Sequence, residues 1–186
     1  MILDELNLVL SKVNKKNDFF DVFIETGSFE GLTLNEVKNE FNSIFSIEIT
    51  EKYSELCKRK FLNNKNITII HGDSLIELPK LINSSKNNKI LFYLDAHYSA
   101  GDTGKNELDV PLIQELGLIS DMCENYCLII IDDADLFEFT DKYLSWEGIN
   151  EVNILNSLKD RVGDYFYLDN ITPKGKKRLI IELKNK

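Results

Sequence analysis

The sequence contains no apolar run long enough to span a bilayer, so we expect no membrane-spanning helix and no membrane partner. It has only three cysteines, none in a two-residue-spaced pair, which argues against a thiolate metal or redox site and favours a cytoplasmic setting. Basic residues are also scarce, since 22 lysines and arginines stand against 31 acids and leave a net charge of -9. Nucleic-acid affinity comes mainly from lysine and arginine, so we expect no nucleic-acid partner.

No repeat, low-complexity tract or interdomain linker interrupts the 186 residues. The chain is long enough to bury one substantial core and short for two, so we expect a single domain over residues 1–186. Residues 1–16 have their acids first, their lysines last and their apolar side chains at helical spacing. That order suits the helix dipole and predicts an N-terminal helix instead of a secretory leader.

The rest of the chain alternates between strand-like and helix-like runs. Strands are expected over residues 21–26, 43–49, 66–73, 88–96 and 126–134, and helices over 31–41, 51–64 and a short segment ending near Leu81. The runs at 88–96 and 126–134 are continuously apolar, which is typical of strands buried on both faces of a parallel sheet. Residues 164–170 and 177–185 leave no room for a crossover helix and predict an antiparallel hairpin at the sheet edge. The pattern therefore predicts an α/β fold.

The turn after the first expected strand, residues 23–31, lacks the Gly-x-Gly-x-x-Gly spacing of a dinucleotide fingerprint. Its glycines are Gly27 and Gly31, with Phe29 between them and Glu25 two residues before the first. A glycine-rich strand-to-helix turn usually lies against a ligand, because glycine lets the backbone approach closely and adopt positive φ. An ordinary turn without a ligand is the alternative.

Acids also end the later strands. Glu48 stands about twenty residues beyond the glycine turn, where a carboxylate can accept both ribose hydroxyls of a nucleotide cofactor. Asp95 ends the fourth expected strand, and Asp132 with Asp133 ends the fifth. Neighbouring strands lie about 4.8 Å apart, so these three carboxylates should converge, and they repel one another unless a cation or a proton lies between them. Oxygen ligands of this kind suit Mg²⁺ or Ca²⁺. Alternatively, Asp133 caps the next helix and only one or two acids face the cleft.

Together these features resemble the class I S-adenosylmethionine-dependent methyltransferases over nearly the whole chain. The acids after the fourth and fifth strands are similar to those of the metal-dependent O-methyltransferases of the catechol, sugar and macrolide type. The glycine turn departs from the family motif, because Phe29 replaces its middle glycine. The resemblance implies a Rossmann-like sandwich with a mostly parallel seven-stranded sheet, a cofactor half at about 20–85 and a metal and substrate half at about 88–186.

The resemblance also implies site residues and S-adenosylmethionine as cofactor. In the family, Gly27 would lie against the amino-acid portion of the cofactor, Glu25 near its ammonium group, and Asp73 and Ser74 near its adenine, although Asp73 could equally be only a helix cap. The full set implied for cofactor binding is Glu25, Thr26, Gly27, Ser28, Gly31, Glu48, Ile49, Asp73, Ser74 and Asp95. The implied ligands of Mg²⁺ or another divalent cation are Asp95, Asp132 and Asp133.

His97 follows the first proposed ligand by two residues and is our candidate general base, working with Asp95 as the second catalytic residue. It could instead be a further metal ligand or a loop residue paired with an acid. The expected substrate contacts are Tyr98 and Lys105, in a polar loop at the carboxyl side of the sheet, and Trp146, which could stack on an acceptor.

We therefore expect an O-methyltransferase that acts on a hydroxyl of a small molecule, with a sugar, glycan precursor or nucleotide-linked sugar as the leading acceptor. The alternatives are a metal-independent methyltransferase in which His97 and Asp95 act directly, a nucleotide-dependent oxidoreductase, and a non-catalytic cofactor-binding protein. A second subunit could complete the cleft of so small a chain, so a homo-oligomer is also considered.

Overall fold

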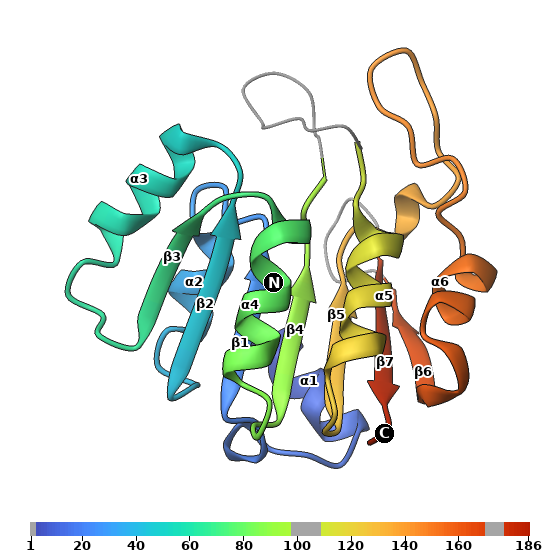
Figure 1. The fold of residues 1–186 in the computed structure, drawn as a ribbon, viewed down its shortest axis with the longest axis horizontal. Helices are drawn as coiled ribbons and strands as arrows, with labels where there is room; N and C mark the ends of the chain where they lie inside the picture. Colours follow the sequence, from blue (N-terminus) through green and yellow to red (C-terminus); the bar gives the residue numbers. More distant parts are fainter. Residues whose placement is uncertain (1–2, 98–108, 170–176) are drawn as a thin grey trace.

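A computed structural model of the chain describes residues 3–97, 109–169 and 177–186 (Figure 1). Its centre is a seven-stranded sheet with the strand order β3-β2-β1-β4-β5-β7-β6. The strands are β1 Val22–Thr26, β2 Ser43–Glu48, β3 Ile67–His71, β4 Ile90–Leu94, β5 Cys127–Ile131, β6 Val162–Leu168 and β7 Arg178–Leu183. The pairs among β1 to β5 are parallel, whereas β7 runs antiparallel to both β5 and β6. The predicted mostly parallel α/β sheet with an antiparallel C-terminal hairpin is confirmed.

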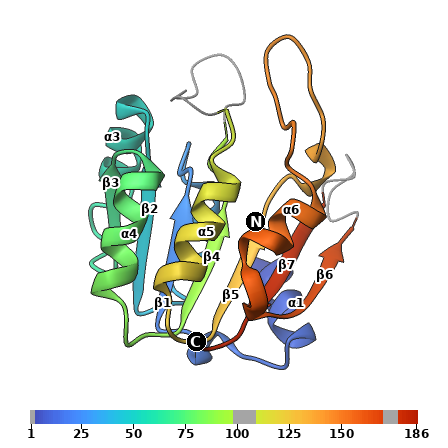
Figure 2. The ribbon, with the colours of Figure 1, turned by 45° about the vertical axis from the view of Figure 1, so that its right-hand side comes forward.

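Helices cover both faces of the sheet, as the two views in Figures 1 and 2 show. The α-helices are α1 Leu3–Lys12, α2 Leu32–Val37, α3 Glu51–Lys60, α4 Ser74–Ser84, α5 Leu112–Met122 and α6 Glu151–Ser157. The described residues also form three short 3₁₀ helices, η1 Asn17–Phe19, η2 Ala134–Leu136 and η3 Lys159–Arg161. None of the helices in the described part of the chain is long and apolar enough to cross a membrane.

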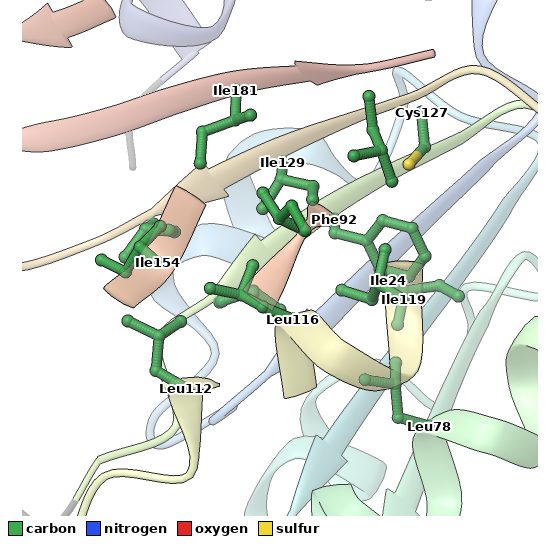
Figure 3. Close-up of a cluster of buried hydrophobic side chains, with 14 of the residues drawn as sticks. Ile24, Leu78, Phe92, Leu112, Leu116, Ile119, Cys127, Ile129, Ile154 and Ile181 are labelled. Carbon is green, nitrogen blue, oxygen red and sulfur yellow. The ribbon is translucent and has the colours of Figure 1, made fainter. Parts of the chain in front are cut away.

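The hydrophobic core consists of two layers, one on each face of the sheet. Because side chains alternate across a strand, Ile24, Phe92 and Ile129 face the layer under α4, α5 and α6, which Figure 3 shows in detail. The neighbouring positions Phe23 and Tyr93 face the opposite layer, which α1, α2 and α3 cover. This alternation decides which way every residue at a strand end points.

The N-terminal segment forms the predicted helix. Leu6, Val9 and Leu10 of α1 are buried against the sheet, as their helical spacing indicates. Two predicted helices are shorter in the structure, since α2 ends at Val37 and α3 at Lys60.

Two α-helices, α5 and α6, were not predicted. The alternation that is visible in the sequence leaves residues 97–125 without a helix, whereas α5 covers Leu112–Met122. This helix packs on the sheet through Leu112, Leu116 and Ile119, spaced four and three residues apart. Gly117 within the segment weakens its helical signal, since glycine is a poor helix former.

The parallel strands bring their carboxyl ends to one edge of the sheet, where β1, β4 and β5 are followed by the glycine turn and the two sets of acids. A long connection between β5 and α6 projects beyond this edge, coloured orange in Figures 1 and 2. This connection, residues 137–149, contains an antiparallel bridge between Thr140 and Ser145 and a backbone hydrogen bond from Glu138 to Ile149, and it is here called the arm. The strand order therefore places the glycine turn, the acids and the arm on the same side of the molecule.

Candidate active site and cofactor-binding turn

The glycine turn runs directly against the end of β4. Gly27 has φ 86°, and a Cβ atom built on it would lie 2.5 Å from the carbonyl oxygen of Asp95. Gly31 has φ 68°, and its Cβ atom would lie 2.8 Å from the ring of Phe61. Both positions therefore require glycine, for backbone conformation and for space.

Phe29 occupies the place of the missing middle glycine and has φ 43°, a conformation that is rare for a residue with a side chain. Two contacts hold it there. Its ring packs on Tyr53 with 4.4 Å between centroids, and its backbone N–H donates a 2.8 Å hydrogen bond to Oε2 of Glu48. The turn is thus fixed by protein contacts in spite of the altered motif.

Glu25 is almost fully buried beneath this turn, with 1% of its surface exposed. Its Oε2 accepts a hydrogen bond from Oγ of Ser46, which in turn contacts Oγ of Ser28 at 2.5 Å. Burial raises the pKa of Glu25 to about 8, so the carboxyl group holds its proton near neutral pH unless a positive charge approaches. A buried carboxyl of this kind is suited to a cationic ligand.

Glu48 ends β2 and points back to the turn. Its Oε1 accepts a 2.8 Å hydrogen bond from the backbone N–H of Thr50, in addition to the bond from Phe29. Each carboxylate oxygen can accept a further bond, so these contacts leave capacity for a ribose hydroxyl. The next residue, Ile49, is 37% exposed at the same edge of the sheet, where an apolar side chain can cover a cofactor ring.

Asp73 is the N-cap of α4, because its side chain accepts a 2.9 Å hydrogen bond from the backbone N–H of Leu75. Asp73 is therefore a helix cap, as the alternative interpretation of the sequence has it. The contact between Asp73 and the adenine of the cofactor stays a prediction. Ser74 and Thr26 are both buried beside it, and both hydrogen-bond the carboxyl group of Glu115 from α5. Glu115 was missed in the sequence because α5 itself was not recognised.

At the ends of β4 and β5, one histidine lies between two aspartates. Nδ1 of His97 is 3.5 Å from Oδ1 of Asp95, and Nε2 is 3.4 Å from Oδ2 of Asp133. One ligand atom from each of the three residues lies within 4.8 Å of the others. Two carboxylates and one imidazole at these separations fit a divalent cation such as Mg²⁺ or Zn²⁺. We call these three residues the acid–histidine cluster.

Asp133 adopts φ 51°, the left-handed conformation, and makes no side-chain capping bond to η2. Non-glycine residues in this region are strained by about 1–3 kcal/mol and are concentrated at functional sites. The strained backbone turns this carboxylate toward His97.

Asp132 points the other way, contrary to the expectation that all three acids converge. Alternation along β5 puts its side chain on the α1 side of the sheet, where Oδ1 is 3.0 Å from Nε of Arg178 and Oδ2 accepts a 2.5 Å hydrogen bond from Tyr93. Arg178 also pairs with Glu5 of α1 at 2.7 Å. Among the described residues, the group that could hold a metal ion is Asp95, His97 and Asp133.

A narrow pocket opens beside the acid–histidine cluster, between the ends of β4 and β5 and the start of α5. Asp95, His97, Glu115 and Trp146 are among the residues that line it. Trp146, expected as a substrate contact, is 2% exposed and lies with its ring centroid 5.2 Å from that of His97. Tyr98 and Lys105, the other expected substrate contacts, lie outside the described residues.

Comparison with known proteins supports the fold. No protein-family model matches the chain, and no curated protein sequence matches it. Among solved structures, the chain is similar to an O-methyltransferase from Bacillus cereus in complex with SAH, with 14% identity, a TM-score of 0.67 and coverage of 98% of this chain and 90% of that one. It is also similar to the O-methyltransferase TomG from Streptomyces achromogenes, involved in tomaymycin synthesis and in complex with SAM, with 8% identity, a TM-score of 0.64 and coverage of 99% and 89%.

A third similar structure is the 23S rRNA methyltransferase ErmE, with 10% identity, a TM-score of 0.56 and coverage of 98% of this chain and 68% of that one. The neighbours thus include O-methyltransferases and a 23S rRNA methyltransferase, so the shared architecture does not decide what this chain acts on. The chain has the fold of the class I S-adenosylmethionine-dependent methyltransferases.

Proposed function

We propose that this protein is an S-adenosylmethionine-dependent methyltransferase that methylates a hydroxyl group of a small molecule. The observation that carries the proposal is the contact between the glycine turn and the acid–histidine cluster. Gly27 approaches Asp95 so closely that a Cβ atom would lie 2.5 Å from the Asp95 carbonyl oxygen. A donor bound over the turn would therefore lie next to the residues that can activate an acceptor.

The turn and the neighbouring strand ends offer the contacts that the donor needs. S-adenosylmethionine, when bound, supplies a methyl group on a positively charged sulfur. Glu25 offers a buried carboxyl to the ammonium group of the donor, and Glu48 offers carboxylate oxygens to its ribose. Asp73 and Ser74, at the start of α4, would lie on the adenine side. Positioning of donor and acceptor would account for most of the rate enhancement.

At the acceptor, His97 would take the proton that the hydroxyl loses. Asp95 and Asp133 lie on either side of the ring, so they stabilise the positive charge that it acquires. If His97 instead serves as a third ligand and not as the base, it and the same two aspartates are the residues that would hold Mg²⁺ or another divalent cation. Such a cation would favour loss of the hydroxyl proton and stabilise the resulting negative charge.

A metal-independent methyltransferase is the second candidate. It is favoured by one specific observation, since both ring nitrogens of His97 already face carboxylate oxygens at 3.5 and 3.4 Å. In the neutral ring one nitrogen donates to one carboxylate, and the other nitrogen, which carries no hydrogen, can act as a base oriented by that acid, without a cation. Metal dependence of catalysis distinguishes the two candidates.

Titration calorimetry with S-adenosylhomocysteine tests the proposal, with MgCl₂ and then with chelator. We expect binding to the wild-type protein, and loss of the Mg²⁺ signal in Asp133→Asn but not in Asp160→Asn, a matched change at an exposed aspartate of η3. No binding of either S-adenosylmethionine or S-adenosylhomocysteine under any metal condition would overturn the methyltransferase proposal. Cofactor binding with no Mg²⁺ signal would favour the metal-independent candidate.

We further propose a sugar or nucleotide-linked sugar as acceptor, because the acids after the fourth and fifth strands, Asp95, Asp132 and Asp133, are similar in sequence to those of the sugar-type O-methyltransferases. The net charge of -9 continues to disfavour a nucleic-acid acceptor. Screening hydroxylated acceptors with radiolabelled donor tests this assignment, and methylation of RNA in place of every small hydroxyl compound would contradict it.

A further inference from the structure

Phe29 stands where the family motif has its middle glycine, and its backbone joins the glycine turn to the carboxylate at the end of β2. Its N–H donates to Oε2 of Glu48 at 2.8 Å, and the N–H of Thr50 donates to Oε1 at 2.8 Å. Each oxygen of the carboxylate is therefore bonded to one backbone N–H, and the two N–H groups come from different segments of the chain. Two bonds to opposite oxygens fix the plane of the buried carboxylate.

Helix α3 holds Phe29 at two further points. The Phe29 ring packs on that of Tyr53 with 4.4 Å between centroids, and the Phe29 carbonyl oxygen accepts a hydrogen bond from Sγ of Cys57 at 3.3 Å. Burial raises the pKa of the Cys57 thiol to about 11, so the thiol keeps its proton and stays a donor at neutral pH. The ring, the carbonyl oxygen and the N–H of one residue are thus all engaged.

The Phe29 side chain restricts the turn in a way that glycine would not. Glycine would keep the backbone N–H and tolerate φ 43°, but it would supply no ring to pack on Tyr53. Glycine also populates many other backbone conformations, so the N–H would face Glu48 in only part of the ensemble. The ring contact therefore selects the conformation in which the bond to Glu48 forms.

We propose that Phe29 is a positioning residue for the methyl donor. Through its ring contact with Tyr53 it keeps its N–H on Glu48, and so presents that carboxylate to the ribose hydroxyls of the donor. Glu48 touches the cofactor, and Phe29 acts through Glu48. A carboxylate that is oriented before binding raises affinity, because its ordering is not charged to the binding step. This inference rests on the proposed methyl transfer and gives the departure from the family motif a function.

Restoring the family glycine tests the proposal by calorimetry with S-adenosylhomocysteine. Phe29→Gly removes the ring and should bind about tenfold more weakly than wild type, whereas Phe29→Tyr keeps an aromatic ring and should bind within about threefold. Phe139→Gly in the arm is the matched control, since Phe139 is 46% exposed and Phe29 is 43% exposed. It should bind like wild type. Equal or tighter binding in Phe29→Gly would overturn the positioning role.

Two further readouts separate positioning from a general loosening of the turn. In the Glu48→Ala background, Phe29→Gly should change affinity by less than about twofold, because the group through which it acts is gone. The same tenfold loss in both backgrounds would overturn the inference. Discrimination between S-adenosylhomocysteine and its 2′-deoxy analogue should also fall in Phe29→Gly and persist in Phe29→Tyr. This ribose readout decides if Glu48→Ala binds too weakly to measure, and equal discrimination in wild type and Phe29→Gly would overturn the inference.

Phe29→Gly should stay folded, because Nζ of Lys60 still bonds the carbonyl oxygens of Glu30 and Gly31 at 2.8 and 3.2 Å. If it does not fold, Tyr53→Ala removes the other ring and should weaken binding about tenfold, and unchanged binding there would overturn the inference. The wild-type titration keeps the two proposals apart. A wild type that binds neither S-adenosylmethionine nor S-adenosylhomocysteine overturns both, whereas normal wild-type binding with equal affinity in Phe29→Gly overturns the positioning role alone.

Discussion

Arg178 and Asp132 form an ion pair in the interior of the protein, with 3.0 Å between Nε and Oδ1 and both side chains almost completely buried. Arg178 belongs to the antiparallel strand β7, and Asp132 follows the parallel strand β5. The pair extends to Glu5 of α1 at 2.7 Å and to the hydroxyl of Tyr93. This network joins the N-terminal helix, the sheet and the base of the candidate site.

Removal of the arginine should destabilise the protein strongly. We expect Arg178→Met to lower the free energy of unfolding by about 3–5 kcal/mol, because it leaves two buried carboxylates without their cation. Adding Asp132→Asn to this variant should recover part of the loss, since it removes one unpaired charge. Urea denaturation of both variants measures these effects, and a loss below about 0.5 kcal/mol for Arg178→Met would contradict a structural role for the pair.

The pKa of Glu25 predicts how cofactor binding depends on pH. In the free protein this pKa is raised to about 8, whereas a bound ammonium group would favour the ionised carboxylate. Binding then releases a proton below pH 8, so affinity for S-adenosylhomocysteine should rise with pH between about 6 and 8, by up to tenfold per pH unit. Above pH 8 this contribution levels off.

Calorimetry in buffers of different ionisation enthalpy measures the released proton. Glu25→Gln should bind more weakly, and it should lose the part of the pH dependence that comes from this site. Affinity that is independent of pH in the wild type, or an identical slope in Glu25→Gln, would show that Glu25 does not face the ammonium group.

Two glycines provide a matched test of the turn. Gly27→Ala should abolish cofactor binding and lower stability, because alanine is strained at φ 86° and its Cβ would meet the Asp95 carbonyl oxygen at 2.5 Å. Gly117→Ala adds the same methyl group in the interior of α5, where nothing lies within 4 Å. It should leave binding unchanged and raise stability by about 0.5–1 kcal/mol. Thermal unfolding measures the stability of both variants, and calorimetry measures their cofactor binding. Intact cofactor binding in Gly27→Ala would refute the assignment of this turn to the cofactor.

The fold could be predicted from the sequence because its signals are local. Continuous apolar runs such as 88–96 mark buried parallel strands, and the short connection between β6 and β7 permits only an antiparallel pair. The prediction of a strand-to-helix turn at residues 23–31 holds although Phe29 replaces a glycine. The contact of its ring with Tyr53 and its backbone bond to Glu48 keep the turn in shape.

The directions of the site residues depend on contacts that the sequence does not show. Asp132 and Asp133 are adjacent in the sequence, yet the alternation of side chains at the end of β5 places their carboxylates on opposite sides of the sheet. The partner that holds Asp132 is Arg178, 46 residues further along the chain. Glu115 was missed for a related reason, since a buried acid within an apolar helix has no local signature.

The two adjacent aspartates should therefore respond differently when a divalent cation is offered. Asp133→Asn removes a carboxylate from the acid–histidine cluster and should weaken Mn²⁺ or Mg²⁺ binding at least tenfold. Asp132→Asn leaves the cluster intact and should keep metal affinity within about threefold, while it lowers the free energy of unfolding through the loss of the Arg178 pair. Mn²⁺ binding measured by water-proton relaxation, at a temperature where both variants are folded, compares them directly. Loss of binding in Asp132→Asn with retention in Asp133→Asn would reverse the assignment and would require Asp132 to leave Arg178 when the cation binds.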